Sequence, residues 1–349
     1  MDPEGSRPQV TVLVPCRNEV RSIGRCLDSL LATEYPLDRL EVLVIDGSSG
    51  DGTREVLRGY TARYPTVRLL DNEGRTTPRA LNLGLSQARG EIILRADAHS
   101  VYPPTYIPRL VAWLQRSGAD NVGGVWRILP GGPGAVAQAI AACLAHPLGA
   151  GNARYRIGAS EPRWVDTVPF GCYRCAVFER LGGFDEELVR NQDDEFNYRL
   201  LRAGGRILLV PEVVCDYYAR DSLRKLWRTY YQYGRFKPLV VQKVGRIMTV
   251  RQVVPTLFLA LVTILGLAGI RYPLAAWTLT GILLLYGGSI LCSAAGVARR
   301  HGLLPGLVAT LVFPTLHVSY GLGMLQGIVE CALRRGGRGR HVADVPVTR

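Results

Sequence analysis

The chain has 349 residues, of which 48% are hydrophobic, and it carries a formal net charge of +13. This length suits one large domain with an appendage. The charge could indicate nucleic acid, but much of it lies next to apolar segments. Nine basic residues and one acid lie between Arg220 and Arg251, and Arg334, Arg335, Arg338 and Arg340 follow Val329. Basic clusters beside apolar spans are typical of proteins that bind anionic headgroups. We therefore expect membrane lipids, and no nucleic acid, as partners.

The N-terminus and the cysteines bear on the compartment. The N-terminal residues are polar and proline-rich, and no apolar region follows a basic start, so we expect no signal peptide. Eight cysteines are scattered through apolar and motif segments. That pattern suits reduced thiols in the cytosol better than a disulfide framework.

Short β-rich runs alternate with helical patterns through the first half of the chain. The predicted strands are Val10–Pro15, Glu41–Asp46, Val67–Asp71 and Glu91–Asp97, and the predicted helices are Val20–Ala32, Thr53–Tyr64 and Pro78–Arg89. This alternation predicts a parallel sheet with helices on both faces. Ligands collect at the carboxyl ends of such strands, so we expect functional roles for Asp46 and Asp97, and a turn role for Asp71.

The pattern is less regular after Asp97, through a glycine-rich stretch at Gly124–Gly134. A helix is predicted at Asp194–Ala203 and a strand at Arg206–Val210. Residues Leu223–Tyr231 then combine an apolar, aromatic stripe with basic residues on the other face. That pattern is typical of a helix in the membrane interface, and an ordinary surface helix is the alternative.

Three apolar segments follow, Val253–Ile270, Tyr272–Ala298 and Leu303–Val329. Each could cross a bilayer, which needs about 20 apolar residues. Two crossings place the basic stretches on the inside, whereas a third would put the arginine-rich tail outside, against the positive-inside tendency. Since Pro305 and Pro314 also make the third segment a candidate for a kinked or re-entrant helix, we leave two or three crossings open.

These boundaries predict four regions. A cytoplasmic catalytic domain occupies residues 1–220, an amphipathic interfacial region 221–251, transmembrane helices 252–330 and a basic tail 331–349.

Seven short motifs lie in order between Val12 and Phe236. They are VPCRNE from Val14, VIDGSSGDGT from Val44, RALNLGLSQARGEIILRAD from Arg79, Asp97-Ala98-His99, GGFD from Gly182, NQDDE from Asn191 and QDDEFNYRLLRAG from Gln192. In this order and spacing the chain resembles glycosyltransferase family 2, and within it the succinoglycan-type exopolysaccharide glucosyltransferases. The resemblance implies an α/β GT-A nucleotide-diphospho-sugar transferase fold, with a Rossmann-like mixed sheet and helices on both faces, followed by a C-terminal α-helical transmembrane region.

The resemblance also implies a nucleotide site at the carboxyl edge of the sheet. Its predicted residues are Pro15, Arg17, Glu19, Asp46, Asp51, Arg79 and Asp97. In the family, the aspartate at the position of Asp46 contacts the nucleotide base. Gly47 stands where many relatives carry a second aspartate, so the geometry of base binding is expected to differ.

Asp97-Ala98-His99 stands where the family carries Asp-x-Asp. A divalent cation there would offset the charge of a departing nucleoside diphosphate. Oxygen ligands suit Mg²⁺ or Mn²⁺, and an imidazole favours Mn²⁺. We predict that Asp97 and His99 bind the cation; the alternative is a strand-end aspartate beside an incidental histidine.

The acidic run Asn191–Glu195 precedes a predicted helix, where carboxylates can be simple caps. The family places its general base here, at the position of Asp193, and Gln192 replaces the usual glutamate. A carboxylate within reach of the acceptor hydroxyl could take its proton. We predict Asp193 as the base, with Asp194 as the second choice.

Gln232-Tyr233-Gly234-Arg235-Phe236 resembles the Gln-x-x-Arg-Trp motif of membrane-bound relatives, with phenylalanine for tryptophan. Arginine can pair with diphosphate oxygens, and an aromatic ring can stack on a sugar. The alternative is the end of the interfacial helix. Phe170, Gly171 and Tyr173 resemble the acceptor-side loop of the family.

The sequence thus predicts an inverting glycosyltransferase that uses a nucleotide-sugar donor, UDP-glucose or another UDP-hexose, and a polyprenyl-diphosphate-linked saccharide as acceptor. We expect a multi-pass protein of the bacterial inner membrane with its catalytic domain in the cytoplasm. The alternatives are transfer to polyprenyl phosphate, processive synthesis, for which the apolar region is short, and a non-catalytic nucleotide-binding scaffold.

Overall fold

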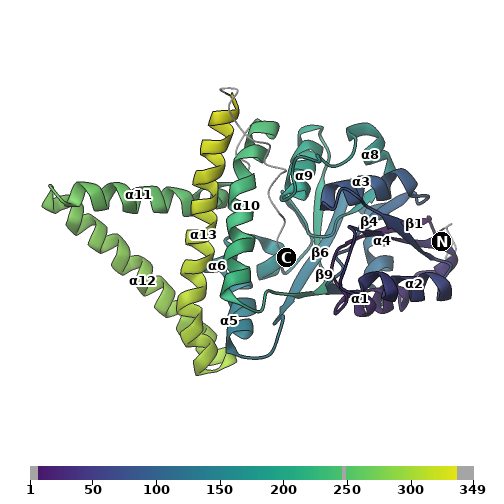
Figure 1. The fold of residues 1–349 in the computed structure, drawn as a ribbon, viewed down its shortest axis with the longest axis horizontal. Coiled ribbons are helices and arrows are strands. Elements are labelled where there is room, and N and C mark those ends of the chain that lie inside the picture. Colours follow the sequence, from purple (N-terminus) through teal and green to yellow (C-terminus); the bar gives the residue numbers. More distant parts are fainter. Residues whose placement is uncertain (1–6, 246–248, 336–349) are drawn as a thin grey trace. The chain divides into compact units, whose positions relative to one another are not determined.

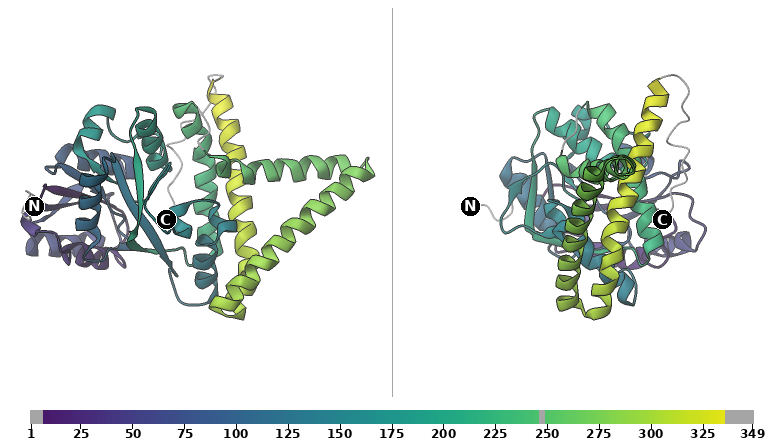
Figure 2. Two further views of the ribbon diagram at one scale, coloured as in Figure 1. Left: turned by 180° about the vertical axis from the view of Figure 1, so that it is seen from behind. Right: turned by 90° about the vertical axis from the view of Figure 1, so that its left-hand side faces the viewer.

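The computed structural model describes residues 7–245 and 249–335. The chain forms two compact units. The first unit contains the chain up to Arg127 and Gly158–Tyr217, and the second contains Ile128–Ile157 and the chain from Tyr218 onward. The sheet and its helices lie in the first unit, and long helices dominate the second (Figures 1 and 2).

Four parallel strands form one half of a mixed sheet. They are β1 (Val10–Cys16), β2 (Leu40–Asp46), β3 (Val67–Asp71) and β4 (Ile92–Arg95), in the order β3-β2-β1-β4. Each of the first three connections is a helix, namely α1 (Ile23–Leu31), α2 (Thr53–Arg63) and α3 (Thr77–Gln87), with a short 3-10 turn η1 (Leu37–Arg39) before β2. All four predicted strands and all three predicted helices are confirmed, with shifted ends; the last strand stops at Arg95, two residues before Asp97.

The other half of the sheet continues in the order β8-β6-β9-β5. These strands are β5 (Ser100–Val101), β6 (Asn121–Leu129), β8 (Cys172–Arg174) and β9 (Ile207–Tyr218), and β7 (Arg163–Trp164) pairs with β9. The first part of the glycine-rich stretch Gly124–Gly134, up to Leu129, belongs to strand β6, which the sequence did not predict. Glycine is required there because a Cβ on Gly124 would lie 2.0 Å from the carbonyl oxygen of Val213.

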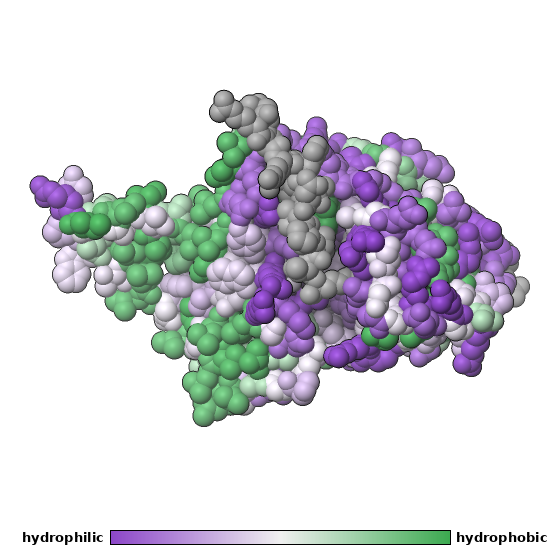
Figure 3. Space-filling view, viewed as in Figure 1, coloured by the Kyte–Doolittle hydropathy of each residue, from purple (hydrophilic) through white to green (hydrophobic). Residues whose placement is uncertain are grey.

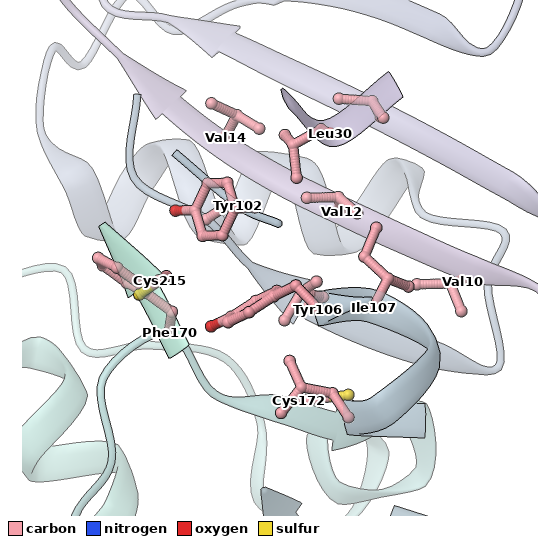
Figure 4. Close-up of a cluster of buried hydrophobic side chains, with 14 of the residues drawn as sticks. Val10, Val12, Val14, Leu30, Tyr102, Tyr106, Ile107, Phe170, Cys172 and Cys215 are labelled. Atoms are coloured by element: carbon pink, nitrogen blue, oxygen red, sulfur yellow. The ribbon is translucent and has the colours of Figure 1, made fainter. Parts of the chain in front are cut away.

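Alternating side chains of the parallel strands build a core on each face of the sheet. Val10, Val12 and Val14 face a buried cluster that includes α1 and α4 (Tyr106–Ser117), together with Phe170 (Figure 4). On the other face α3 packs so closely that a Cβ on Gly84 would lie 2.8 Å from Leu13. Two short helices, α8 (Cys175–Leu181) and α9 (Gln192–Arg202), complete the first unit.

The second unit is helical. Its helices are α5 (Ala135–Leu144), α6 (Pro147–Ala150), α7 (Arg154–Ile157), α10 (Leu223–Val244), α11 (Val254–Gly269), α12 (Pro273–His301) and α13 (Leu303–Arg335), with a 3-10 turn η2 (Val250–Gln252). The predicted amphipathic helix and the three apolar segments correspond to α10–α13. Within the described residues, α12 and α13 are long and apolar enough to cross a membrane, and α11 is shorter. Most of the predicted basic tail lies outside the described residues.

Helix α5 shares a core with the C-terminal helices. Its buried residues Ile140 and Cys143 cluster with Leu226 of α10 and with Phe313 and Leu316 of α13. Residues 128–157 therefore belong with the C-terminal helices, although they lie far earlier in the sequence.

Candidate functional site

The carboxyl ends of the four parallel strands meet at one edge of the sheet. In the strand register, Cys16 lies beside Asp46, and Asp46 lies beside Asp71. β1 is flanked by β2 on one side and by β4 on the other, so the order of strands reverses at β1. Ligands of such sheets bind outside the strand ends at this reversal, which makes the loops after β1, β2 and β4 the candidate site.

The loops after β1 and β2 are joined by hydrogen bonds. The Asn18 amide donates to Ser49 Oγ at 2.7 Å, and the Gly50 amide donates to Asn18 Oδ1 at 3.0 Å. The Val20 amide donates to Asp51 Oδ2 at 3.2 Å. Burial acts to raise the pKa of Asp51, but hydrogen bonds from Thr53 and Val20 outweigh it and hold this pKa below its ordinary value. Asp51 thus links the loop after β1 to the loop after β2 by hydrogen bonds.

Asp46 lies at the centre of this edge and is fully buried. Its carboxylate accepts hydrogen bonds from the Ser49 amide at 3.0 Å and from Arg54 Nη1 at 2.9 Å. The same guanidinium nitrogen donates to Asp71 at 2.6 Å. Arg54 therefore organises both strand-end aspartates, and the predicted contact of Asp46 with a base stays a prediction that would require this arrangement to open.

Arg17 and Pro15 lie where β1 passes into its loop. Pro15 is the last but one residue of β1 and pairs with Ile45. The side chain of Arg17 covers Gly47, whose added Cβ would lie 3.3 Å from Arg17 Cβ. Gly47 therefore leaves room for Arg17, which offers a cation at the position where many relatives carry a second aspartate.

Arg79, another predicted nucleotide-binding residue, is more than half exposed at the start of α3 and pairs with Glu186 at 3.2 Å. One turn later, Asn82 donates to the carbonyl of Phe184 and accepts from its amide. A Cβ on Gly183 would lie 2.4 Å from Asn82 Oδ1, which explains the glycine of the Gly182–Asp185 motif. These contacts hold that loop against α3.

The predicted metal ligands lie together just after β4. His99 Nε2 is 4.0 Å from Asp97 Oδ2, and His99 Nδ1 is 3.4 Å from Glu19 Oε1. A cation with bonds of about 2.1 Å in near-octahedral geometry places neighbouring ligand atoms about 3 Å apart, so the Asp97 and His99 side chains would have to approach each other to bind one ion. Within the described residues, no group of three His, Cys, Asp or Glu side chains is arranged to hold a metal ion. The binding of a cation by Asp97 and His99, with phosphate and water oxygens as its other ligands, therefore stays a prediction.

Asp193 and Asp194 lie in the first turn of α9, and both are partly buried. Asn191, which precedes the helix, has a φ of +61°, a conformation that asparagine adopts more readily than most residues. The Asp194 amide donates to Asp193 Oδ1 at 3.0 Å. The Asp193 side chain is 38% exposed, so this carboxylate is open enough to receive a proton from a ligand.

Arg95, the last residue of β4, connects the predicted metal ligand with the predicted base. Its Nη2 donates to Asp97 Oδ1 at 3.0 Å and its Nη1 donates to Asp193 Oδ2 at 3.2 Å. Burial acts to lower the pKa of Arg95, but the two carboxylates outweigh it and raise this pKa. Sequence reasoning missed Arg95. The available signal was a charged residue in an otherwise apolar strand, because a buried charge requires a partner.

Arg95→Lys should lower turnover by about 10- to 100-fold. An ammonium cannot hold two carboxylates with a rigid fork of N–H donors, and a lost charged hydrogen bond costs about 1.5–3 kcal/mol, or one to two factors of ten in rate at about 1.36 kcal/mol each. The initial rate of sugar transfer is the measurement. Arg68→Lys is the matched control, because Arg68 pairs with Glu41 near the opposite ends of the strands. Equal turnover in the Arg95→Lys and Arg68→Lys variants would show that Arg95 does not position the site.

Aromatic rings line the site beside His99. Tyr217 makes an edge contact with the His99 ring at 5.8 Å and stacks on Trp126 at 4.1 Å, both measured between ring centroids. Phe170 lies 5.6 Å from Trp126 and has a φ of +49°, a strained value for a bulky residue that costs about 1–3 kcal/mol. The partly exposed rings of Trp126 and Tyr217 can stack on a sugar, and sequence reasoning did not select them. Phe170, which resembles part of the acceptor-side loop, is buried.

The predicted acceptor-side residues Gly171 and Tyr173 lie in the interior. A Cβ on Gly171 would lie 2.5 Å from the Tyr173 ring. Tyr173 is buried, contacts Phe196 and Phe178, and donates a hydrogen bond to Asn197. Their direct contact with an acceptor stays a prediction.

Gln232, Arg235 and Phe236 all lie on α10, in the second unit. Gln232 and Phe236 are buried. Arg235 makes a bidentate ion pair with Glu330 of α13, with distances of 2.6 and 3.0 Å. These contacts give the motif a packing role, and its contact with a diphosphate stays a prediction.

The comparisons with known proteins agree with this geometry. Residues 11–182 match the model of "Glycosyl transferase family 2". The chain is 30% identical over 326 residues to the succinoglycan biosynthesis protein ExoA of Rhizobium meliloti (strain 1021), an alignment that covers 91% of this chain and 94% of that protein. The chain belongs to glycosyltransferase family 2. It is therefore a glycosyltransferase, as its motifs predicted.

A second relative and a solved structure extend the comparison. The chain is 26% identical over 243 residues to the dolichyl N-acetyl-α-D-glucosaminyl phosphate 3-β-D-2,3-diacetamido-2,3-dideoxy-β-D-glucuronosyltransferase of Methanococcus voltae, covering 67% of this chain and 74% of that enzyme. The structure of the mannosyltransferase PcManGT from Pyrobaculum calidifontis, in complex with GDP-Man and Mn²⁺, superposes with a TM-score of 0.57 at 22% identity, covering 90% of this chain and 88% of that one. The GT-A fold of this glycosyltransferase is thereby confirmed.

Proposed function

We propose that this glycosyltransferase transfers a hexose, with inversion, from a UDP-sugar to a saccharide carried on polyprenyl diphosphate. The donor we favour is UDP-glucose. The observation that carries the proposal is the double contact of Arg95, which holds Asp97 and Asp193 on one guanidinium at the carboxyl edge of the sheet. In the reaction, the diphosphate of the donor and the hydroxyl of the acceptor meet at one carbon of the sugar. A cation ligand and a base held on one guanidinium suit this arrangement.

In this proposal Asp193 takes the proton of the acceptor hydroxyl. The hydroxyl oxygen forms a bond to the anomeric carbon of the sugar, and the bond from that carbon to the diphosphate breaks from the opposite side. Asp97 and His99 would hold a divalent cation, Mn²⁺ or Mg²⁺, which when bound offsets the charge on the diphosphate. The complex of PcManGT with GDP-Man and Mn²⁺ supports a divalent cation in general.

The names of two relatives support the proposed lipid-linked acceptor and the proposed membrane location. One is named for succinoglycan biosynthesis, and the other is named for transfer onto a dolichyl-phosphate sugar. The apolar helices α12 and α13 support a membrane location. We therefore propose that the enzyme acts at the cytoplasmic face of the inner membrane. Its catalytic domain would be residues 1–220, apart from the segment 128–157 that packs with the C-terminal helices.

The test uses membranes that contain the full chain and one radiolabelled donor at a time. We expect UDP-glucose, or failing that another UDP-hexose, to label the lipid fraction only when a polyprenyl-diphosphate saccharide is present. Membranes with the Asp193→Asn variant measure the background. Label from GDP-mannose alone would contradict the UDP donor. Label on polyprenyl phosphate without a saccharide would instead support the direct polyprenyl-phosphate transferase.

A further inference from the structure

Helix α13 lies directly against α10 in the second unit. Added Cβ atoms on Gly323 and Gly327 would lie 2.1 Å from the carbonyl oxygen of Tyr231 and 2.2 Å from that of Arg235. The ion pair of Arg235 with Glu330 joins the same two helices. Small residues four apart allow helix backbones to meet, so α10 and α13 behave as one element.

Helix α10 is too polar to enter a bilayer. Arg224, Lys225, Arg228 and Lys243 are all exposed on it. Charged side chains in the hydrocarbon are strongly disfavoured unless they reach water or a partner. If α13 crossed the bilayer, α10 would be carried in beside it. The length and composition of α13 therefore do not make it a membrane span.

Helix α13 instead has the pattern of a helix that lies in the headgroup layer. One side packs on α10 and α5 through residues such as Phe313 and Leu316. Another side exposes a stripe of large apolar residues at helical spacing, namely Leu304, Leu307, Leu311, Leu322, Leu325 and Val329. One apolar face opposite a packed, basic partner is typical of an interfacial helix.

Helices α11 and α12 form an apolar hairpin that projects from α13 (Figures 1 and 3). Large hydrophobic side chains are exposed along both helices, including Leu257, Leu267, Trp277 and Leu284. Their exposed hydroxyl groups bond to carbonyls of their own helix; examples are Thr263, Thr278, Thr280, Ser289 and Ser293. Internal bonding of this kind is what polar groups require in lipid.

The ends of the hairpin match the two surfaces of a bilayer. Arg271 and Tyr272 lie at its tip, with the guanidinium 5.9 Å from the ring centroid. Arg299 and Arg300 are exposed at its base. The 16 residues of α11 span about 24 Å, about 6 Å less than the hydrocarbon thickness of about 30 Å. A long arginine at the tip can bridge the remaining distance to the far headgroups.

We propose that α11 and α12 cross the bilayer as a hairpin, while α10 and α13 lie in the anionic headgroup layer on the catalytic side. The inference rests on the proposed membrane location and adds the number of crossings. Both ends of the hairpin then lie on one side, together with the exposed basic residues of α10 and of the base of the hairpin. This arrangement satisfies the positive-inside tendency that three crossings would violate.

The first test labels single cysteines in intact bacterial cells with a membrane-impermeant maleimide. The full chain carries Cys175→Ala, Cys292→Ala and Cys331→Ala, so that the more accessible native thiols are removed. We expect Arg271→Cys to be labelled in intact cells, and a cysteine appended after Arg349 to be labelled only in opened cells. Labelling of the appended cysteine from outside would overturn the proposal in favour of three crossings. Protection of Arg271→Cys in intact cells would show that the hairpin does not cross.

A matched pair of charge substitutions provides an independent test. Leu284 of α12 and Leu311 of α13 are exposed to similar extents, 71% and 60%. We expect Leu284→Lys to lower the carbonate-resistant membrane fraction several-fold, and Leu311→Lys to leave it nearly unchanged because its ammonium can reach the headgroups. The reverse order would overturn the proposal. UDP binding by both variants checks folding of the catalytic unit, and a wild-type chain found in the soluble fraction would contradict the membrane location itself.

Discussion

Asp193→Asn should lower turnover by about 100-fold or more, since general-base catalysis typically contributes at least that much. The amide has nearly the shape of the carboxylate, and its single oxygen can still accept the hydrogen bond from Arg95, with loss of the bond from the Asp194 amide, which reaches the other carboxylate oxygen. Folding and nucleotide binding should therefore remain. Initial rates with saturating donor and acceptor measure the loss, and calorimetry measures the affinity for UDP.

Asp194→Asn is the control for the assignment of the base. The two aspartates are neighbours in the first turn of α9 and are both partly buried, so the same change affects the helix start similarly. We expect the Asp194 variant to keep most of its activity. If that variant is inactive while Asp193→Asn has normal turnover, the base is Asp194 and the assignment is displaced by one residue.

Asp97→Ala should reduce transfer by about a thousandfold, and a chelator should do the same to the unmodified enzyme. A bound divalent cation stabilises developing charge by several kcal/mol, and each 1.36 kcal/mol or so is a factor of ten in rate. Transfer rates with and without added Mn²⁺ test both statements. Binding of Mn²⁺ in the presence of UDP, followed by electron paramagnetic resonance, tests them without turnover.

Asp97→Asn separates the proposed cation role from the contact with Arg95. The amide oxygen can still accept from Arg95 Nη2, as the carboxylate does at 3.0 Å, but it lacks the negative charge that favours a cation. We expect this variant to be nearly as inactive as Asp97→Ala. Normal turnover of Asp97→Asn would mean that Asp97 serves only to position Arg95, and full turnover in chelator would remove the cation from the mechanism.

Much of the first unit could be predicted because its signals are local. Apolar, β-branched runs such as Val10–Pro15 and the helical spacing at Thr53–Tyr64 depend on neighbours within one element. The acidic residues at strand ends and at the start of α9 follow from the same local patterns and from the family motifs. Strand β6 escaped prediction because Gly123 and Gly124 obscure its pattern, and these glycines are required by distant contacts with Val168 and Val213.

By itself, the sequence determined the order of strands and helices, the family, and the residues that could carry a charge or a proton. The tertiary structure decided which of those charges meet. Arg95 contacts Asp193 across 98 positions and Arg235 contacts Glu330 across 95, and no local pattern encodes such pairs. The same holds for the apolar helices. The hydropathy of α13 depends only on its own residues, whereas its proposed position in the headgroup layer depends on the basic helix α10 that packs against it. Packing partners determine whether an apolar helix faces lipid or protein, because burial is a property of the contacts and not of the segment.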